Sequence, residues 1–167
     1  MIQIYFGTGK GKTTASIGQA IRGVGAGMKV AFIQFLKPEN SSELKVLRKI
    51  DNLDVYTINK SDKFLWEMEN LDEVKKEIKE GMKLLEKILD KKKYDMLILD
   101  EILHLVENNL IAEKELLILI ENKNIEIILT GKKSGEELNK KADIVTEMKK
   151  IKHCYDKGKK AKKGIEF

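Results

Sequence analysis

The sequence predicts an α/β fold in which helices cover both faces of a mostly parallel sheet of about six strands, giving three layers. Short apolar runs alternate along the chain with longer amphipathic stretches, as in repeated strand–helix units. Most of the apolar runs show no polar alternation, as expected of strands that are buried on both faces. A loop rich in glycine and lysine lies directly between the first apolar run and the first amphipathic stretch.

The strands are expected where apolar residues run without interruption, and the helices where they recur every three or four positions. The expected strands span residues 2–6, 29–35, 53–58, 94–100, 125–130 and 143–148. The clearest helix spans residues 72–92, where an apolar stripe runs opposite a charged face. Further helices are expected at residues 13–26, 41–50, 101–109, 113–122 and 134–141.

The length of 167 residues favours a single domain. Residues 1–148 carry the α/β pattern, and residues 149–167 are a lysine-rich C-terminal segment of the same domain. Within that segment, residues 149–163 hold eight lysines and one aspartate, so the rest of a chain of net charge +5 is slightly acidic. Two interpretations of this segment remain open: a solvated tail, or a tail that meets an anionic ligand or an acidic partner. With arginine only at Arg22 and Arg48, nucleic-acid binding is disfavoured.

Other protein classes are excluded by what the sequence lacks. No apolar run approaches the roughly 20 residues that a membrane-spanning helix needs. The N-terminus shows no signal-peptide pattern, so we expect a cytoplasmic protein. A single cysteine and two histidines assemble neither a disulfide framework nor a zinc cluster of the usual spacing.

The glycine- and lysine-rich loop has the context of a nucleotide-phosphate loop, because it follows a strand and opens a helix. Its candidate ligand-binding residues are Gly7, Thr8, Gly9, Lys10, Gly11, Lys12, Thr13 and Thr14. The loop is one residue shorter than the standard pattern, since three residues instead of four separate Gly7 from Gly11. The alternative is a glycine-rich turn that only connects strand to helix.

Each residue type in this loop suits the binding of phosphate. Glycines allow positive φ angles and bring backbone N–H groups close to phosphate oxygens. The following helix adds free N–H donors and the positive end of its dipole. Lys12 is expected to reach across the phosphates, and the Thr13 hydroxyl to coordinate Mg²⁺.

Acidic and polar residues at the ends of two other strands complete the candidate site. Asp100 and Glu101 end an apolar strand, where a carboxylate can hold Mg²⁺ or a water bound to it. The alternative is that they cap the next helix. Gln34 and Lys37 end the second strand and are placed either to meet a ligand or simply to terminate the strand. In an open α/β sheet, ligands bind outside the carboxyl ends of the strands.

Read together with nine further motifs, the loop resembles that of the ATP:corrinoid adenosyltransferases of the cobalamin-biosynthesis type. The resemblance runs from residue 2 to residue 167. The motifs are AIR (20–22), IQFLK (33–37), Glu43, FLWE (64–67), LDE (99–101), LTGK (129–132), ADIVTEM (142–148), KH (152–153) and GIEF (164–167).

The resemblance implies a RecA-like P-loop fold and transfer of the 5′-deoxyadenosyl group of ATP to the cobalt(I) centre of a reduced corrinoid, with triphosphate as the leaving group. It also implies Mg²⁺ as a cofactor, a homodimer and an electron donor such as a reduced flavodoxin. By similarity, Glu101 is the direct or water-bridged partner of the metal and Asp100 supports it, although the sequence alone does not order the two. Where the family commonly has arginine, this chain has Lys132.

Two aromatic residues, Phe64 and Trp66, lie in an otherwise polar stretch. The resemblance implies that they pack beneath the corrinoid and displace its lower axial ligand, which makes cobalt(II) easier to reduce. The alternative is that they anchor the loop to the core or to a dimer partner.

Two other functions remain open at this stage. A small-molecule kinase or NTPase would share the loop and the acidic strand end, but would cut ATP at a phosphoanhydride and would not need the aromatic pair. A nucleic-acid-associated ATPase would use the basic tail and would bind in a strongly salt-dependent way.

Overall fold

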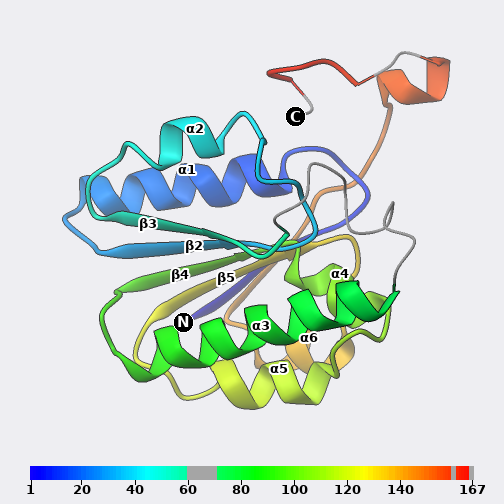
Figure 1. Cartoon of the computed structure of the whole chain (residues 1–167). Coiled ribbons are helices and arrows are strands. Elements are labelled where there is room, and N and C mark those ends of the chain that lie inside the picture. Colours follow the sequence, from blue (N-terminus) through cyan, green and yellow to red (C-terminus); the bar gives the residue numbers. More distant parts are fainter. Residues whose placement is uncertain (60–70, 159–160, 166–167) are drawn as a thin grey trace.

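Six parallel strands form the centre of the molecule in the computed structural model, which describes residues 1–59, 71–158 and 161–165 (Figure 1). The strands are β1 (Ile2–Phe6), β2 (Val30–Gln34), β3 (Leu53–Thr57), β4 (Met96–Asp100), β5 (Glu126–Gly131) and β6 (Ile144–Glu147). Their order in the sheet is β3-β2-β4-β5-β1-β6, and every pairing is parallel. The predicted α/β fold class is therefore confirmed.

Helices cover both faces of the sheet (Figure 1). On one face lie α1 (Lys12–Gly25) and α2 (Leu44–Leu47). The other face is covered by α3 (Leu71–Asp90), α4 (Ile102–Glu107), α5 (Glu113–Ile120) and α6 (Glu136–Lys141). The C-terminal segment includes a short 3₁₀ helix, η2 (Cys154–Lys157).

The continuous apolar strands follow from this layering. In β4, Leu97 and Leu99 pack into the core beneath α3, whereas Met96 and Ile98 pack into the core beneath α1. All four side chains are at most 2% exposed. Burying each of these side chains stabilises the folded state by roughly 1.5–3 kcal/mol relative to leaving it exposed. A polar residue at any of these positions would face one core or the other.

The edge strand β6 differs from the others because all four of its residues are exposed. Ile144 and Val145 keep 42% and 41% of their surface accessible. Among the described residues β6 pairs with β1 alone, and its end leads directly to Met148 beside the glycine-rich loop.

The expected and observed elements differ mainly at their ends. The helix expected at residues 41–50 is only the four-residue α2, because the chain first turns after Pro38. The Ser41 hydroxyl donates to the Pro38 carbonyl at 3.0 Å, and the Ser41 N–H donates to the same carbonyl. This turn places Ser42 and Glu43 near the carboxyl end of β2 rather than along a helix. In the described part of the chain, none of the helices is long and apolar enough to cross a lipid bilayer.

Candidate active site

The loop between β1 and α1 is held against the ends of two neighbouring strands. Gly7 and Gly11 have φ angles of 121° and 111°, which side chains other than glycine rarely adopt. The Gly7 N–H donates to the Lys132 carbonyl at 3.0 Å, and the Gly9 N–H donates to the Met148 carbonyl at 2.6 Å. A side chain on Gly9 would run into the Met148 carbonyl group. The predicted turn therefore depends on glycine for both conformation and space.

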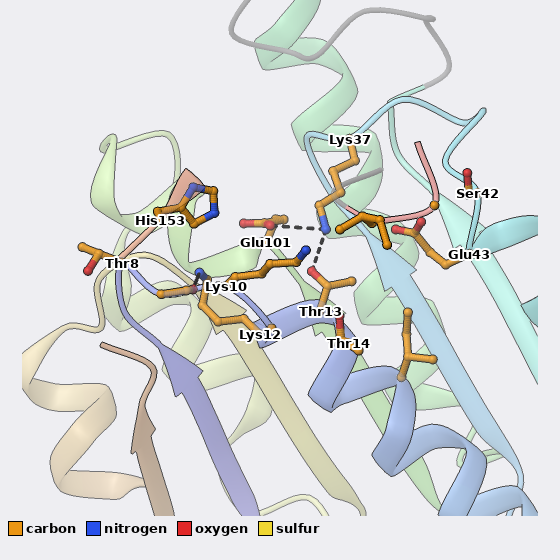
Figure 2. A pocket seen from close by; sticks show the side chains of 15 residues that line it. Thr8, Lys10, Lys12, Thr13, Thr14, Lys37, Ser42, Glu43, Glu101 and His153 are labelled. Atoms are coloured by element: carbon orange, nitrogen blue, oxygen red, sulfur yellow. Dashed lines mark hydrogen bonds and ion pairs between the residues drawn. The ribbon is translucent and has the colours of Figure 1, made fainter. Parts of the chain in front are cut away.

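This loop lines a cavity of about 670 Å³ at the carboxyl edge of the sheet (Figure 2). The wall combines the loop, the segment after β2, the end of β4 and the C-terminal segment. The lining residues are Thr8, Gly9, Lys10, Gly11, Lys12, Thr13, Thr14, Ile17, Lys37, Ser42, Glu43, Glu101, His153, Gly164 and Ile165. Seven of the eight predicted loop residues thus face one cavity, and Gly7 instead lines an adjoining one.

The Lys37 ammonium lies at the centre of the polar network in this cavity (Figure 2). Its Nζ donates to Thr13 Oγ1 at 2.6 Å and to Asp100 Oδ2 at 2.9 Å, and lies 3.3 Å from Glu101 Oε1. Burial alone would lower the pKa of Lys37, but the charges of Asp100 and Glu101 outweigh it and raise the pKa. Lys37 is therefore held as a cation among the three predicted metal ligands.

Asp100 is fully buried beneath the cavity and accepts hydrogen bonds on both carboxylate oxygens. Thr13 and Thr130 donate to Oδ1 at 2.9 and 2.7 Å. Lys37 and Gln34 donate to Oδ2 at 2.9 and 3.2 Å. A buried carboxylate is tolerated only with such partners. Gln34 is itself fully buried and does not line the cavity, so the structure places it behind Asp100 rather than at the cavity surface.

Glu101 stands at the start of α4 in a left-handed conformation, with φ 64°. This strained backbone is fixed by a hydrogen bond from the Glu101 N–H to Thr130 Oγ1 at 2.9 Å. Its carboxylate lies between Lys37 and His104, whose Nε2 is 3.0 Å from Glu101 Oε2. Burial would raise the pKa of Glu101, but the hydrogen bond from His104 and the charges of Lys37, His104 and Lys12 lower it to about 2.

Lys12 lies across the opening of the loop, where its ammonium donates to the Gly9 carbonyl at 2.9 Å. Burial lowers the pKa of Lys12; Glu101 and Asp100 oppose this shift, and the like charge of Lys37 adds to it. Lys12 and Lys37 thus bring two cations to one cavity, and both reach it from the carboxyl edge of the sheet. Such an arrangement attracts a multiply charged anion.

The residues present suit a hard divalent cation. The Thr13 hydroxyl and the carboxylates of Asp100 and Glu101 are oxygen donors of the kind that Mg²⁺ prefers. A cationic group, the Lys37 ammonium, already lies among these oxygens. Mg²⁺ ordinarily completes its octahedral shell with water and with substrate phosphates, so few protein ligands are needed.

Several residues of the site were missed by sequence reasoning. His104 contacts Glu101, and its Nδ1 lies 3.4 Å from Glu107 Oε2. The other carboxylate oxygen, Glu107 Oε1, pairs with Lys133 at 3.1 Å. The spacing of Glu101, His104 and Glu107 by three residues, within one predicted helix, was the available signal. Ser42 carries no comparable signal, since only the fold brings it to the cavity, whereas Ile165 belongs to the GIEF motif at residues 164–167.

Some residues that the sequence singled out do not line the main cavity. Lys132 does not line the main cavity but a neighbouring one of about 400 Å³, together with Gly7, Thr8, Lys12, His104 and Lys150. The predicted catalytic aromatics Phe64 and Trp66 lie outside the described residues, so their role stays a prediction.

Comparisons with known proteins show the family to which the chain belongs. The sequence model of the family ATP:corrinoid adenosyltransferase BtuR/CobO/CobP matches residues 1–167. The chain belongs to this family. It is an ATP-using transferase that adenosylates a corrinoid, with ATP and the corrinoid as substrates.

Individual members of the corrinoid adenosyltransferase family agree with this assignment. The chain is 30% identical over 173 aligned residues to the corrinoid adenosyltransferase of Sinorhizobium sp, covering all of this chain and 80% of that protein. It is 28% identical to the enzyme of Escherichia coli K12, with 100% and 85% covered. Among solved structures, domain III of the Thermotoga maritima replication initiation protein DnaA matches with a TM-score of 0.43 and 18% identity, covering 88% of this chain and 54% of that one. That last likeness is too remote to bear on function.

Proposed function

We propose that this adenosyltransferase acts on the cobalt(I) form of its corrinoid and releases intact triphosphate. The observation that carries the proposal is the convergence of Lys12, Lys37 and the loop N–H groups on one cavity, which suits an anionic leaving group. This cavity lies in a chain whose family transfers the adenosyl group of ATP.

In the proposed reaction, the electron pair of cobalt(I) in the corrinoid substrate forms a bond to C5′ of ATP. The C5′–O bond breaks, and its electrons leave with the triphosphate, while the cobalt becomes formally cobalt(III). No proton is transferred and no water is consumed. The enzyme therefore needs groups that stabilise a departing anion rather than a general base.

Lys12 and the backbone N–H groups of residues 11–14 would stabilise the charge that develops on the triphosphate as the C5′–O bond breaks. Because these donors are already fixed by the strand ends and by α1, little reorganisation is needed during the reaction. Thr13 and Glu101, supported by Asp100, would hold Mg²⁺. The ion would neutralise phosphate charge as a Lewis acid.

The remaining parts of the proposal rest on the sequence resemblance. Phe64 and Trp66 would pack beneath the corrinoid and remove its lower axial ligand. A reduced flavodoxin-like donor would supply the electron that generates cobalt(I), and its acidic surface would suit the lysine-rich residues 149–163. The resemblance also implies a homodimer, and the missing signal-peptide pattern implies a cytoplasmic location. We expect neither a nucleic acid nor a membrane as a partner.

The proposal is tested by anaerobic incubation of the purified chain with ATP, Mg²⁺ and chemically reduced cob(I)alamin. We expect the cobalt(I) absorption to disappear and a light-sensitive alkyl-cobalt product to form. Lys12→Ala should lower kcat/KM by roughly 100-fold or more, because a charge that stabilises the leaving group is lost.

Lys29→Ala is the matched control, because Lys29 is an exposed lysine at the opposite edge of the sheet. It should leave the rate unchanged. Cobalt(I) that persists in the presence of folded wild-type enzyme and Mg·ATP would contradict the proposal.

A further inference from the structure

Lys37 lies where a metal ion would be expected, and it is held there by an unusual backbone. The preceding residue, Leu36, is 5% exposed and has a φ angle of 62°, which is rare for a bulky side chain. The buried Asn59 holds this conformation, since its Nδ2 donates to the Leu36 carbonyl at 3.2 Å. The Lys37 N–H donates to the Phe35 carbonyl at 2.6 Å. A strained turn therefore directs Lys37 back into the cavity.

The Lys37 ammonium uses the same oxygens that a metal ion would need. It lies 2.6 Å from the Thr13 hydroxyl, 2.9 Å from Asp100 and 3.3 Å from Glu101. Mg²⁺ binds oxygen at about 2.0–2.1 Å and carries twice the charge. Two cations cannot share these oxygens without strong repulsion, because like charges only a few ångströms apart in a partly buried site are poorly screened.

The network is also close to electrical balance while Lys37 is in place. The ammonium groups of Lys37 and Lys12 face the carboxylates of Asp100 and Glu101. Glu43 is linked to this network by Gln34, whose Nε2 donates to both Glu43 and Asp100. A free divalent cation would have to displace a buried, well-paired ammonium and gain only the same few protein oxygens. A divalent cation bound to triphosphate brings phosphate oxygens with it, and these can accept the displaced ammonium.

We infer that Lys37 is a specificity-determining residue that makes the site take a divalent cation only as its triphosphate complex. The inference rests on the proposed metal-binding role of Thr13, Asp100 and Glu101. Without nucleotide, Lys37 occupies the metal-binding oxygens and excludes free metal. With the nucleotide complex, the Lys37 side chain turns from the carboxylates to the phosphates, because Lys37 and the loop that would hold the phosphates line the same cavity.

The test measures Mn²⁺ binding by the electron paramagnetic resonance of free Mn²⁺, with no nucleotide and no corrinoid present. Lys37→Met should bind one Mn²⁺ per chain at least about tenfold more tightly than the wild type, because an uncompensated buried carboxylate pair is left for the metal. Lys37→Arg keeps the charge and should exclude Mn²⁺ as the wild type does. Lys45→Met removes one exposed lysine charge from α2 and should also match the wild type.

A second substitution locates the new site. Adding Thr13→Val to Lys37→Met should remove the gain in Mn²⁺ affinity. If Lys37→Met folds poorly, its thermal unfolding is followed instead, and Mn²⁺ should raise its Tm while leaving that of the wild type unchanged.

Equal Mn²⁺ affinity of the wild type and Lys37→Met, together with no rise in Tm, would overturn the inference. It would also be overturned if Thr13→Val left the gain intact. The measurement involves no adenosyl transfer, so failure of the cobalt(I) reaction leaves its result standing. If ATP fails to bring Mn²⁺ to the wild-type chain, the proposed metal site itself fails, and this inference with it.

Discussion

Asp100 receives its four hydrogen bonds from four different parts of the chain. Thr13 lies in the first turn of α1, Gln34 ends β2, Lys37 follows β2 and Thr130 lies on β5. Because the carboxylate is fully buried, each donor offsets part of the cost of removing its charge from water. The same bonds fix the positions of Thr13 and Lys37. One buried residue therefore connects the phosphate loop to the strands on either side of β4.

The lowered pKa of Glu101 predicts how the free energy of unfolding depends on pH. Its folded-state pKa is about 2, below the ordinary value of 4.5, so the folded chain binds fewer protons than the unfolded chain between these values. Glu101 therefore stabilises the fold fully above pH 4.5, and this contribution is lost as the pH falls toward 2. The contribution is on the order of 3 kcal/mol.

Urea unfolding between pH 5.5 and 2.5, without metal or nucleotide, measures this contribution. The free energy of unfolding of the wild type should fall more steeply with acid than that of Glu101→Gln, which has no carboxylate to protonate at this position. Parallel curves for the two proteins would show that Glu101 is not held ionised by His104 and Lys37.

At the scale of the elements, the conformation of the phosphate loop depends on contacts with the ends of β5 and β6 as well as on its own glycines. The loop N–H groups of Gly7 and Gly9 bond to carbonyls of the residues that follow these two strands. The edge strand β6 has an exposed surface and adds little to the core, so its main contribution is to position Met148 beneath the loop. This explains why a strand with little buried surface lies next to the candidate site.

Gly9→Ala tests this contact between loop and strand. The new Cβ would lie 2.6 Å from the Met148 carbonyl oxygen, so the loop must move away from β6. We expect ATP affinity to fall at least about tenfold and stability to fall by about 1–3 kcal/mol. Calorimetric titration with ATP and thermal unfolding measure the two effects.

Gly18→Ala is the matched control, because Gly18 lies on the exposed face of α1, where an added Cβ would meet no neighbouring atom within 4 Å. This substitution should raise stability by about 0.5–1 kcal/mol and leave ATP affinity unchanged. Equal ATP affinity for both variants would show that ATP binding does not depend on the contact between Gly9 and Met148.

Sequence periodicity predicted the elements well because burial on two faces leaves a strong pattern. The strand expected at residues 2–6 is observed with the same bounds, and those at 94–100 and 143–148 shorten by one or two residues at their ends. The helix expected at 41–50 was too long, since its apolar spacing does not reveal the turn after Pro38. Local turns depend on hydrogen bonds that periodicity does not encode.

The site was predictable only in part, for a different physical reason. Loop residues such as Lys12 and Thr13 are contiguous, so their spacing carries the chemistry. The contacts of His104 with Glu101, and of Lys37 with Asp100, arise from strand order and backbone conformation. The positive φ angle of Leu36 could not be predicted, because the sequence has no glycine at that position to indicate it.

At the scale of the whole molecule, the C-terminal segment returns to the opening of the cavity. His153, Gly164 and Ile165 line this cavity together with the loop residues. The predicted division into residues 1–148 and a C-terminal segment of the same domain stays a prediction, and this contact is the feature that favours it. Bound nucleotide would lie between the two parts.

Hydrogen exchange with and without Mg·ATP tests that arrangement. The amides of residues 150–158 and 161–165 make few backbone hydrogen bonds, so they should exchange quickly in the free chain and more slowly with Mg·ATP. Helix α5 lies on the far side of the sheet and should show no change. Unchanged exchange throughout the C-terminal segment would mean that it takes no part in the nucleotide site.

Proposed cleavage of ATP at C5′ is tested by identifying the phosphate products. After a single anaerobic turnover with cob(I)alamin and Mg²⁺, the products are separated and the phosphates are identified by ³¹P nuclear magnetic resonance. We predict triphosphate and adenosylated corrinoid in equal amounts, without ADP. Formation of ADP and phosphate, with cobalt(I) unchanged, would contradict the claim and indicate a phosphoanhydride-cleaving enzyme.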